Sequence, residues 1–335
     1  MKSKIEGIKS VDFKIEAKGH GVVNWNGSTR LVTIADGKDK TIDNHTLPKL
    51  RKYTNLTGKY WEDGKPKYKY TNDIDFEKTP LYISQNCIRH HLFRANSFFD
   101  FQSEEVVDNL DKLICSMVGL VRGYVIPKPN EDKRTSALLL EDFVDTKYEG
   151  NYEQMVKAGS KEKTKNKKGK ESSASLFSKT TFGDTHYKAN GSISIEQLQF
   201  ISLDSKFSRQ AITYAQEKDK KALAKKLTDY INELGNTDKA EAVYHKNYVR
   251  QGSIYDIGEA GILLNDVAID IVVNEMLDLL ENLTIRQAKG YMYVDKIELD
   301  YNDSSKAKDM MRIKNEGDRN SEKGQLKYAQ YFVGV

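Results

Sequence analysis

The hydrophobic residues of this chain follow two different periods, and the period changes several times along the sequence. Residues 8–19 alternate apolar and charged positions, with Val11, Phe13 and Ile15 on one side, which predicts an opening strand. Residues 192–203 and 291–301 alternate in the same way, and residues 119–127 and 252–264 are also typical of strands.

Helical spacing appears between these strands. One helix is predicted to begin after Ser84, and a second at Ser103, where acidic residues fill the first turn. A third carries leucines at helical spacing and stops at Gly235, a residue type common at helix ends. A fourth, over residues 266–282, has a broad apolar face.

The order of these segments predicts an α+β fold. It runs strand, helix, strand, further strands, helix, strand, which favours an antiparallel sheet with helices on one face, as in the RRM-like (ferredoxin-like) fold. We expect one such domain over residues 1–335 with large inserted extensions. These are an extension off the first strand at 25–80, a loop and hairpin region at 128–190, and a helical segment at 205–250.

Composition narrows the class of protein. With 335 residues, 30% of them charged and 38% hydrophobic, the chain is typical of a soluble folded protein. Its apolar runs are much shorter than the roughly 20 residues of a membrane span, and its first residues lack a secretory signal, so we expect a cytoplasmic protein. Cys87 and Cys115 have no CxxC spacing, which indicates core thiols.

The positive charge of the chain is concentrated in the run KEKTKNKKGK at 161–170. Six lysines and one glutamate give this run +5, and because the whole chain is +4, all other residues together carry −1. Residues 158–175 lack apolar periodicity, which predicts a mobile loop. The loop is either a cationic arm that contacts nucleic acid or a solvated loop. The nucleic-acid contacts would be Lys163, Lys165, Lys167 and Lys168.

The stretch TPLYISQNCIRHHLFRANSFF places two adjacent histidines in the first predicted helix. Adjacent helical residues point apart, and no carboxylate lies within this helix, so a metal or catalytic pair is disfavoured. His91 falls on the apolar face with Cys87, which favours a core-edge residue. The opposite face offers donors to phosphates and sugars, or is simply solvated. Its members are Gln85, Asn86, Arg89, His90 and Arg94.

The stretch TIRQAKGYMYVDKI joins a helix to the last predicted strand. It matches part of an RNA-binding sequence pattern at Lys289, Gly290, Tyr291 and Val294, while Met292 and Lys296 depart from it. An ordinary edge strand with half-buried tyrosines explains the same residues.

Other motifs have no catalytic spacing. The sequence has no phosphate-binding P-loop, no nucleophile elbow and no GxGxxG after a strand, so we expect neither an enzyme nor a cofactor or metal. The residues that we expect to bind RNA are Gln85, Asn86, Arg89, His90, Arg94, Lys179, Phe182, Arg250, Arg286, Gln287, Lys289 and Tyr291.

Several stretches together resemble one known family. The similarity is to the Cascade backbone subunit of the minimal, variant type I-F CRISPR system, a Cas-seven family of the RAMP superfamily. It runs from about residue 5 to the end of the chain. The stretches are GHGVVNWNG, DNHTLPKLR, TPLYISQNCIRHHLFR, SKTTFGDT, GSISIEQLQFISL, GILLND and IRQAKGYMYVD.

The resemblance implies an RRM-like palm whose copies assemble head to tail, as a helical filament, along the spacer of a CRISPR RNA. Each copy would hold the RNA backbone and displace a base at intervals, and the intervening bases would pair with target DNA in prokaryotic antiviral defence. A separate helicase-nuclease would cut the DNA. The other expected partners are the subunit that caps the five-prime end and the endonuclease that processes the RNA.

Two points of the resemblance stay open. The glycine-rich loop that RAMP proteins often carry before the last strand is reduced here to IRQAKG, so the roles of Arg286, Gln287 and Lys289 follow from position alone. A rival from a different class is a RAMP-type endoribonuclease that uses His90 or His20 as general acid or base.

Overall fold

The structure is a computed structural model with mixed helices and sheets. It describes residues 5–35, 38–48, 59–68, 79–94, 110–127, 131–147, 152–158, 164–165, 171–172, 175–253, 257–315 and 317–335. None of the helices in these residues is long and apolar enough to span a membrane.

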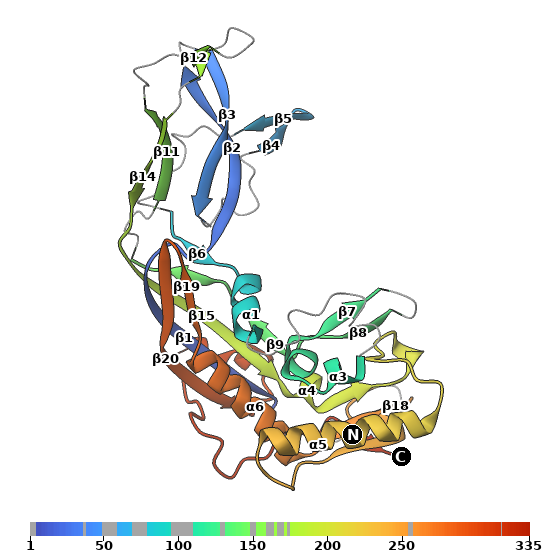
Figure 1. The fold of residues 1–335 in the computed structure, drawn as a ribbon. Helices are drawn as coiled ribbons and strands as arrows, with labels where there is room; N and C mark the ends of the chain where they lie inside the picture. The colour runs from blue at the N-terminus through green and yellow to red at the C-terminus, as the bar shows by residue number, and fades with distance from the viewer. Residues whose placement is uncertain are drawn as a thin grey trace.

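A curled antiparallel sheet forms the centre of the molecule (Figure 1). Its strand order is β19-β20-β1-β15-β10-β6, and β9 pairs with β15 beside β10. The strands are β1 (Ser10–Gly21), β6 (Tyr82–Ile83), β9 (Leu138–Leu140), β10 (Phe143–Asp145), β15 (Asp184–Ser194), β19 (Thr284–Gln287) and β20 (Gly290–Asn302). The longest ladders join β1 to β15 and β1 to β20, and a bulge between Glu16 and Ala17 shifts the second register.

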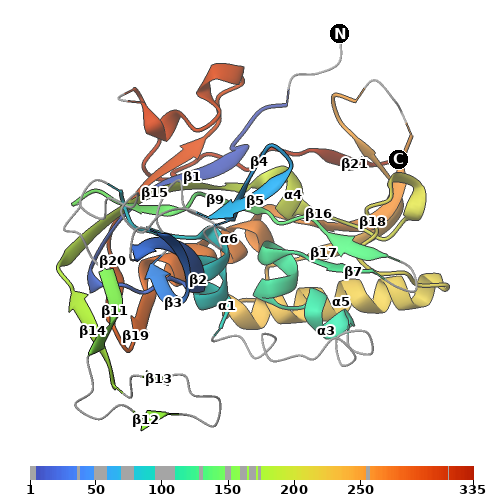
Figure 2. The ribbon, with the colours of Figure 1, turned by 90° about the horizontal axis from the view of Figure 1, so that it is seen from above.

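The two faces of this sheet differ in burial. Val11, Phe13, Ile15 and Ala17 of β1 are buried on one face, in the same core as residues of α1 (Gln85–Phe93) and α6 (Asp266–Glu281). Both helices lie on this side of the sheet (Figure 2). The alternate residues of β1 point to the opposite side, which we call the outer face.

A second sheet continues the core toward both chain ends. Its order is β16-β18-β17-β21, formed by β16 (Phe200–Ser202), β17 (Ala242–Arg250), β18 (Glu259–Leu264) and β21 (Phe332–Gly334). Helix α5 (Glu217–Leu234) packs on β17 and on α6. The shorter helical segments are α3 (Leu110–Ile114), η3 (Val118–Arg122), α4 (Ile195–Gln199), η4 (Ser205–Phe207), η5 (Ala307–Asp309) and η6 (Arg312–Lys314).

The structure also contains five separate two-stranded ribbons among the described residues. The longer ones, β2–β3 and β11–β14, stand away from the sheet at the top of Figure 1, where β3 contacts β11. Their strands are β2 (Trp25–Ala35), β3 (Lys38–Pro48), β11 (Tyr152–Ala158) and β14 (Ser175–Thr181). The shorter ribbons are β4 (Lys59–Glu62) with β5 (Lys65–Tyr68), β7 (Tyr124–Ile126) with β8 (Asp132–Arg134), and β12 (Thr164–Lys165) with β13 (Glu171–Ser172).

Most of the predicted elements are confirmed. The opening strand is β1, the strand at 252–264 contains β18, and the strand at 291–301 lies within β20. The helices after Ser84 and before Gly235 are α1 and α5, and the helix at 266–282 is α6. Of the helix predicted from Ser103, residues 103–109 lie outside the described residues, and α3 is the part that the structure describes.

Two predicted strands are wrong in part. Residues 119–127 begin with the helical turn η3, and only β7 is extended. Residues 192–203 contain the helical turn α4 between β15 and β16. The reason for the second error is local, because the Ser194 side chain accepts a 3.4 Å hydrogen bond from the amide of Gln197 and caps a helix that interrupts the alternating pattern.

Candidate nucleic-acid interface

Helix α1 presents the polar face that its sequence predicts. Its N-cap is Ser84, whose Oγ accepts a hydrogen bond of 3.4 Å from the amide of Cys87. Ile88, Leu92 and Phe93 are buried against the core. On the other side the exposed residues are Gln85, Asn86, His90 and Arg94.

The N-terminus of α1 is already occupied by acceptors from this chain. The amide of Ser84 donates to Asn24 Oδ1 at 3.0 Å, and the amide of Gln85 donates to Asp142 Oδ1 at 2.9 Å. A carboxylate therefore lies where the helix dipole would favour a phosphate. The amides of Ser84 and Gln85 are therefore already paired within this chain.

Arg89 is turned toward the central sheet. Its guanidinium donates to Ser136 Oγ at 3.0 Å and to the carbonyl oxygen of Leu138 in β9. Burial, together with the nearby Arg122, lowers the pKa of Arg89. These contacts join α1 to the edge of the sheet, so Arg89 holds the helix in place and differs from its exposed neighbours.

The two histidines of α1 lie in different environments, as the helical spacing predicts. His90 is exposed and His91 is half-buried, and their rings meet edge to face at 5.2 Å. Burial lowers the pKa of His91, and the charges of His90 and Arg94 lower it further. No group of three His, Cys, Asp or Glu side chains among the described residues is arranged to hold a metal ion.

The turn between β19 and β20 lies against the end of β1. The amide of Val22 donates to the carbonyl oxygen of Lys289 at 3.1 Å. Gly21 has φ +72°, and a Cβ atom there would lie 2.3 Å from that same carbonyl oxygen. The ammonium group of Lys289 lies 5.3 Å from the centre of the Trp25 ring, within the range of a cation–π contact.

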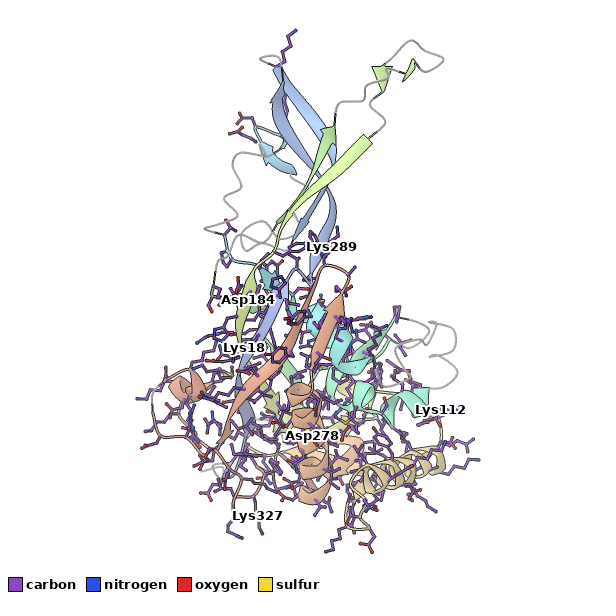
Figure 3. The ribbon with its side chains drawn as sticks, turned by 60° about the vertical axis from the view of Figure 1, so that its left-hand side comes forward. Lys18, Lys112, Asp184, Asp278, Lys289 and Lys327 are labelled. Carbon is purple, nitrogen blue, oxygen red and sulfur yellow. The ribbon has the colours of Figure 1, made fainter. Side chains whose placement is uncertain are left out.

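Residues 22–25 connect this turn to α1, since they contact Lys289 on one side and Ser84 on the other. We use the name rim for the set of residues that meet here, which are Asn24, Trp25, Ser84, Gln85 and Lys289. Two clusters that are about 200 positions apart in the sequence thus meet at one end of the central sheet. Figure 3 shows Lys289 there, near the base of the ribbons.

Arg286 and Tyr291 lie on the outer face of the sheet. They are cross-strand partners in the β19–β20 ladder, and Tyr291 is in turn opposite His20 of β1. Directly opposite residues project to the same side of a sheet. Both side chains are exposed, and half of the surface of Tyr291 is accessible.

The other predicted RNA-binding residues lie elsewhere. Arg250 of β17 is in the second sheet, where its Nε donates to Glu196 Oε1 at 2.5 Å and its guanidinium lies over the Tyr331 ring. Phe182 is half-buried against the core. Lys179 belongs to β14 and Lys165 to β12, and their side chains lie outside the described residues, as do Lys163, Lys167 and Lys168 altogether.

The sequence predicts Arg286, Tyr291 and His20 of the outer face as candidates but not the polar pairs that surround them. His20 Nδ1 lies 3.1 Å from Asp184 Oδ1, Lys18 pairs with Asp295 at 2.7 Å, and Lys188 pairs with Glu16 at 3.0 Å. The signal was present, because every second residue of β1 from Lys14 to His20 is polar. Alternation alone, however, cannot show which residues of β15 and β20 lie opposite them.

Comparison with known proteins identifies the family. A family model described as type I-Fv CRISPR-associated protein Cas7fv-like matches residues 7–335. A solved chain titled CRISPR RNA-guided surveillance complex is similar at 10% identity, over 73% of this chain and 71% of that chain, with a TM-score of 0.24. A TM-score this low does not establish a shared fold, so membership of the family rests on the family model alone. No curated protein matches the chain.

Proposed function

Since the chain belongs to the type I-Fv Cas7-like family, as the match over residues 7–335 shows, we propose that it is the CRISPR-RNA-binding backbone subunit of a Cascade surveillance complex. The family match carries this proposal. The polar face of α1 and the cationic β19–β20 turn support it, because donors of this kind position a nucleic-acid backbone without reading its sequence.

We propose that the central sheet is an RRM-like palm. The order β20-β1-β15-β10, antiparallel throughout, with α1 after β1 and α6 before β20, supports this interpretation. The extensions at 25–80 and 128–190 include the two long ribbons and the lysine-rich loop at 158–175, while β9, β10 and the first part of β15, which also fall within 128–190, belong to the palm sheet. Residues 205–250, which include α5 and β17, form the third insertion.

The proposed RNA contacts divide into two groups. Exposed donors on α1 and at the β19–β20 turn orient phosphates and sugars: Gln85, Asn86, His90, Arg94, Gln287 and Lys289. On the outer face, Arg286 contacts a phosphate and Tyr291 a sugar or base. Arg89 and Arg250 act through the helix and strand that they hold. Lys179 and Phe182 complete the proposed RNA contacts, and the lysine run is a secondary nucleic-acid contact.

The family role further predicts assembly. Several copies polymerise head to tail along the spacer of the guide and support its pairing with target DNA. The proposed partners are the subunit that caps the five-prime end, the endonuclease that processes the RNA, and a helicase-nuclease that cuts the DNA. The backbone subunit itself is non-catalytic in this proposal.

One observation favours a second function. The ring of His20 is held by Asp184 at 3.1 Å, an arrangement in which a carboxylate orients an imidazole for acid–base chemistry. The alternative is a RAMP-type endoribonuclease in which His20, rather than His90, is the general acid or base.

One preparation tests both proposals. The full chain is expressed in a bacterial host with a CRISPR RNA, purified at moderate salt, and analysed for particle mass and for the length of the bound RNA. Intact guide RNA in particles whose mass grows by whole subunits supports the backbone role. Protein that carries no RNA contradicts it.

The ribonuclease alternative predicts RNA trimmed to one defined end, and loss of trimming in His20→Ala. His245→Ala serves as the matched control, since His245 lies on β17 of the second sheet and is not among the proposed RNA contacts.

A further inference from the structure

A pocket of about 290 Å³ opens on the outer face of the central sheet, near the rim. Strands β1, β15 and β20 supply most of its walls, and Lys147, which follows β10, completes them. Figure 3 shows Lys18 and Asp184 on the same part of the molecule, below Lys289. The pocket residues are Lys18, Gly19, Lys147, Asp184, Thr185, His186, Tyr291 and Tyr293.

The pocket is built from two adjacent rows of side chains that cross the sheet. The first row is Arg286, Tyr291, His20 and Asp184, taken across β19, β20, β1 and β15. The second row is Tyr293, Lys18 and His186 on the last three of these strands. Each row therefore places a tyrosine of β20 next to a basic residue of β1, which is His20 in the first row and Lys18 in the second.

The aromatic rings are accessible. Tyr291 is 50% exposed and Tyr293 is 41% exposed, whereas the tyrosines of the core, such as Tyr187, are almost fully covered. The rings of His20 and Tyr291 are stacked, with centroids 6.3 Å apart and planes inclined by 26°. Two neighbouring exposed rings on one strand provide flat surfaces on which a planar ligand can stack.

The charges around the pocket are nearly balanced. Lys18 is paired with Asp295 at 2.7 Å, and Asp184 lies 3.1 Å from His20 and 3.5 Å from Lys147. A site that depended on phosphate alone would have excess cations. Here carboxylate acceptors and lysine donors surround the rings, and such groups can hydrogen-bond to the polar edge of a base. Arg286, at the end of the first row, can contact the phosphate of the same nucleotide.

From this geometry we propose that the outer-face pocket holds an unstacked base of single-stranded nucleic acid, packed on Tyr291 and Tyr293 and hydrogen-bonded by Asp184 and Lys18. The inference rests on the proposed function and adds to it a base-binding site on the side of the sheet away from α1. The strand that supplies the base is the guide RNA or a single strand of DNA, and the experiment distinguishes them.

The test compares intact and abasic oligonucleotides. The full chain is titrated with a single-stranded RNA, with the same RNA lacking its bases, and with the DNA of the same sequence. Base stacking on an aromatic ring is lost when the ring is removed. The variant Tyr291→Ala/Tyr293→Ala should therefore bind the intact strand roughly five- to a hundred-fold more weakly and the abasic strand with unchanged affinity.

A matched variant separates the ring from its hydroxyl group. Tyr291→Phe/Tyr293→Phe keeps both rings and should retain affinity for the intact strand within about twofold, because stacking is preserved. Circular dichroism and thermal unfolding confirm that both variants are folded. Cross-linking with a photoactivatable base, followed by peptide mapping, should mark residues 290–293 of the wild-type chain.

The outcomes are distinct. Tyrosine-dependent binding of RNA assigns the pocket to the guide, and tyrosine-dependent binding of DNA alone assigns it to a DNA strand; both support the pocket. Wild-type binding that the alanine variant leaves unchanged overturns the base pocket and leaves the backbone role intact. A wild-type chain that binds no strand overturns the proposed function, and the base pocket with it.

Discussion

Asp142 caps the first turn of helix α1, because its Oδ1 accepts a hydrogen bond of 2.9 Å from the backbone amide of Gln85. The helix that carries the most RNA-binding candidates therefore has an internal anion at the end where its dipole is positive. The polar side chains of α1, rather than its N-terminus, are left to meet a nucleic acid.

This relationship predicts the effect of Asp142→Asn. Removing the negative charge should raise the affinity for RNA by about two- to fivefold, because a carboxylate next to the proposed phosphate path is lost. It should also cost about 0.3–1 kcal/mol of unfolding free energy through the weaker helix-dipole interaction. Equilibrium titration and urea unfolding measure the two effects. An affinity that falls would show that Asp142 positions α1 for binding.

The turn and the outer face predict a change in salt dependence. Lys289→Ala and Arg286→Ala should each weaken RNA binding for every sequence and reduce the slope of log affinity against log salt by about one. Lys218→Ala is the matched control, since Lys218 is exposed on α5, which packs on the second sheet, whereas Arg286 and Lys289 lie at the edge of the central sheet. The measurement is a titration at several salt concentrations. Equal slopes for the three variants would exclude direct phosphate contacts at Lys289 and Arg286.

The part of this site that the sequence predicts is the part set by local interactions. Ser84 and Cys87 are three residues apart, so the cap of α1 and its polar face follow from helical geometry alone. The inward turn of Arg89 does not, because Ser136 is 47 positions away. Asp142 is 57 positions from Gln85, which is equally beyond local reasoning.

The outer face shows the same limit for strands. Alternation in β1 places Lys18 and His20 on one face, yet the register that brings them opposite Tyr293 and Tyr291 is set by packing over more than 270 positions. The pocket was therefore not predictable, although each of its strands carries a visible pattern. The strand-to-helix errors at 119–127 and 192–203 arose where apolar residues of a short buried turn look like those of a strand.

Gly21 is predicted to be essential for the shape of the rim. Its φ is +72°, and a Cβ atom added there would lie only 2.3 Å from the carbonyl oxygen of Lys289, which leaves no room for a side chain. Gly21→Ala should lower the unfolding free energy by about 1–3 kcal/mol. Gly64→Ala, where φ is also positive but no atom lies within 4 Å, is the control for backbone strain alone. Chemical denaturation of both variants gives the comparison, and equal losses would contradict the steric argument.

Arg134 is predicted to be a structural residue despite its charge. It is 7% exposed and donates to four main-chain carbonyl oxygens, of Leu120, Gln197, Leu198 and Phe200, at 3.0–3.3 Å. Burial lowers the pKa of its guanidinium to about 10.

Arg134→Met removes these four hydrogen bonds to buried carbonyl oxygens, so a loss of about 3 kcal/mol or more of unfolding free energy is expected, because a buried polar group that loses its partner costs about 1–3 kcal/mol. The RNA affinity of the fraction that stays folded should not change. Urea unfolding with and without RNA tests this, and a folded variant that has lost RNA binding would instead assign Arg134 to the interface.

Glu298 on β20 predicts a pH dependence of stability. Hydrogen bonds from Lys296 at 2.7 Å and Arg319 at 2.9 Å lower the pKa of its carboxyl from the ordinary 4.5 to about 2. Because the folded state has the lower pKa, the stabilisation is fully present above about pH 4.5 and is lost as the pH falls toward 2. Glu298→Gln should therefore destabilise the protein by about 1 kcal/mol or less near neutral pH, as is usual for solvent-screened ion pairs. The difference in urea midpoint between wild type and Glu298→Gln should shrink as the pH falls from about 5 to about 3. A difference that stays constant over that range would show that the Glu298 side chain stabilises β20 by packing rather than by charge.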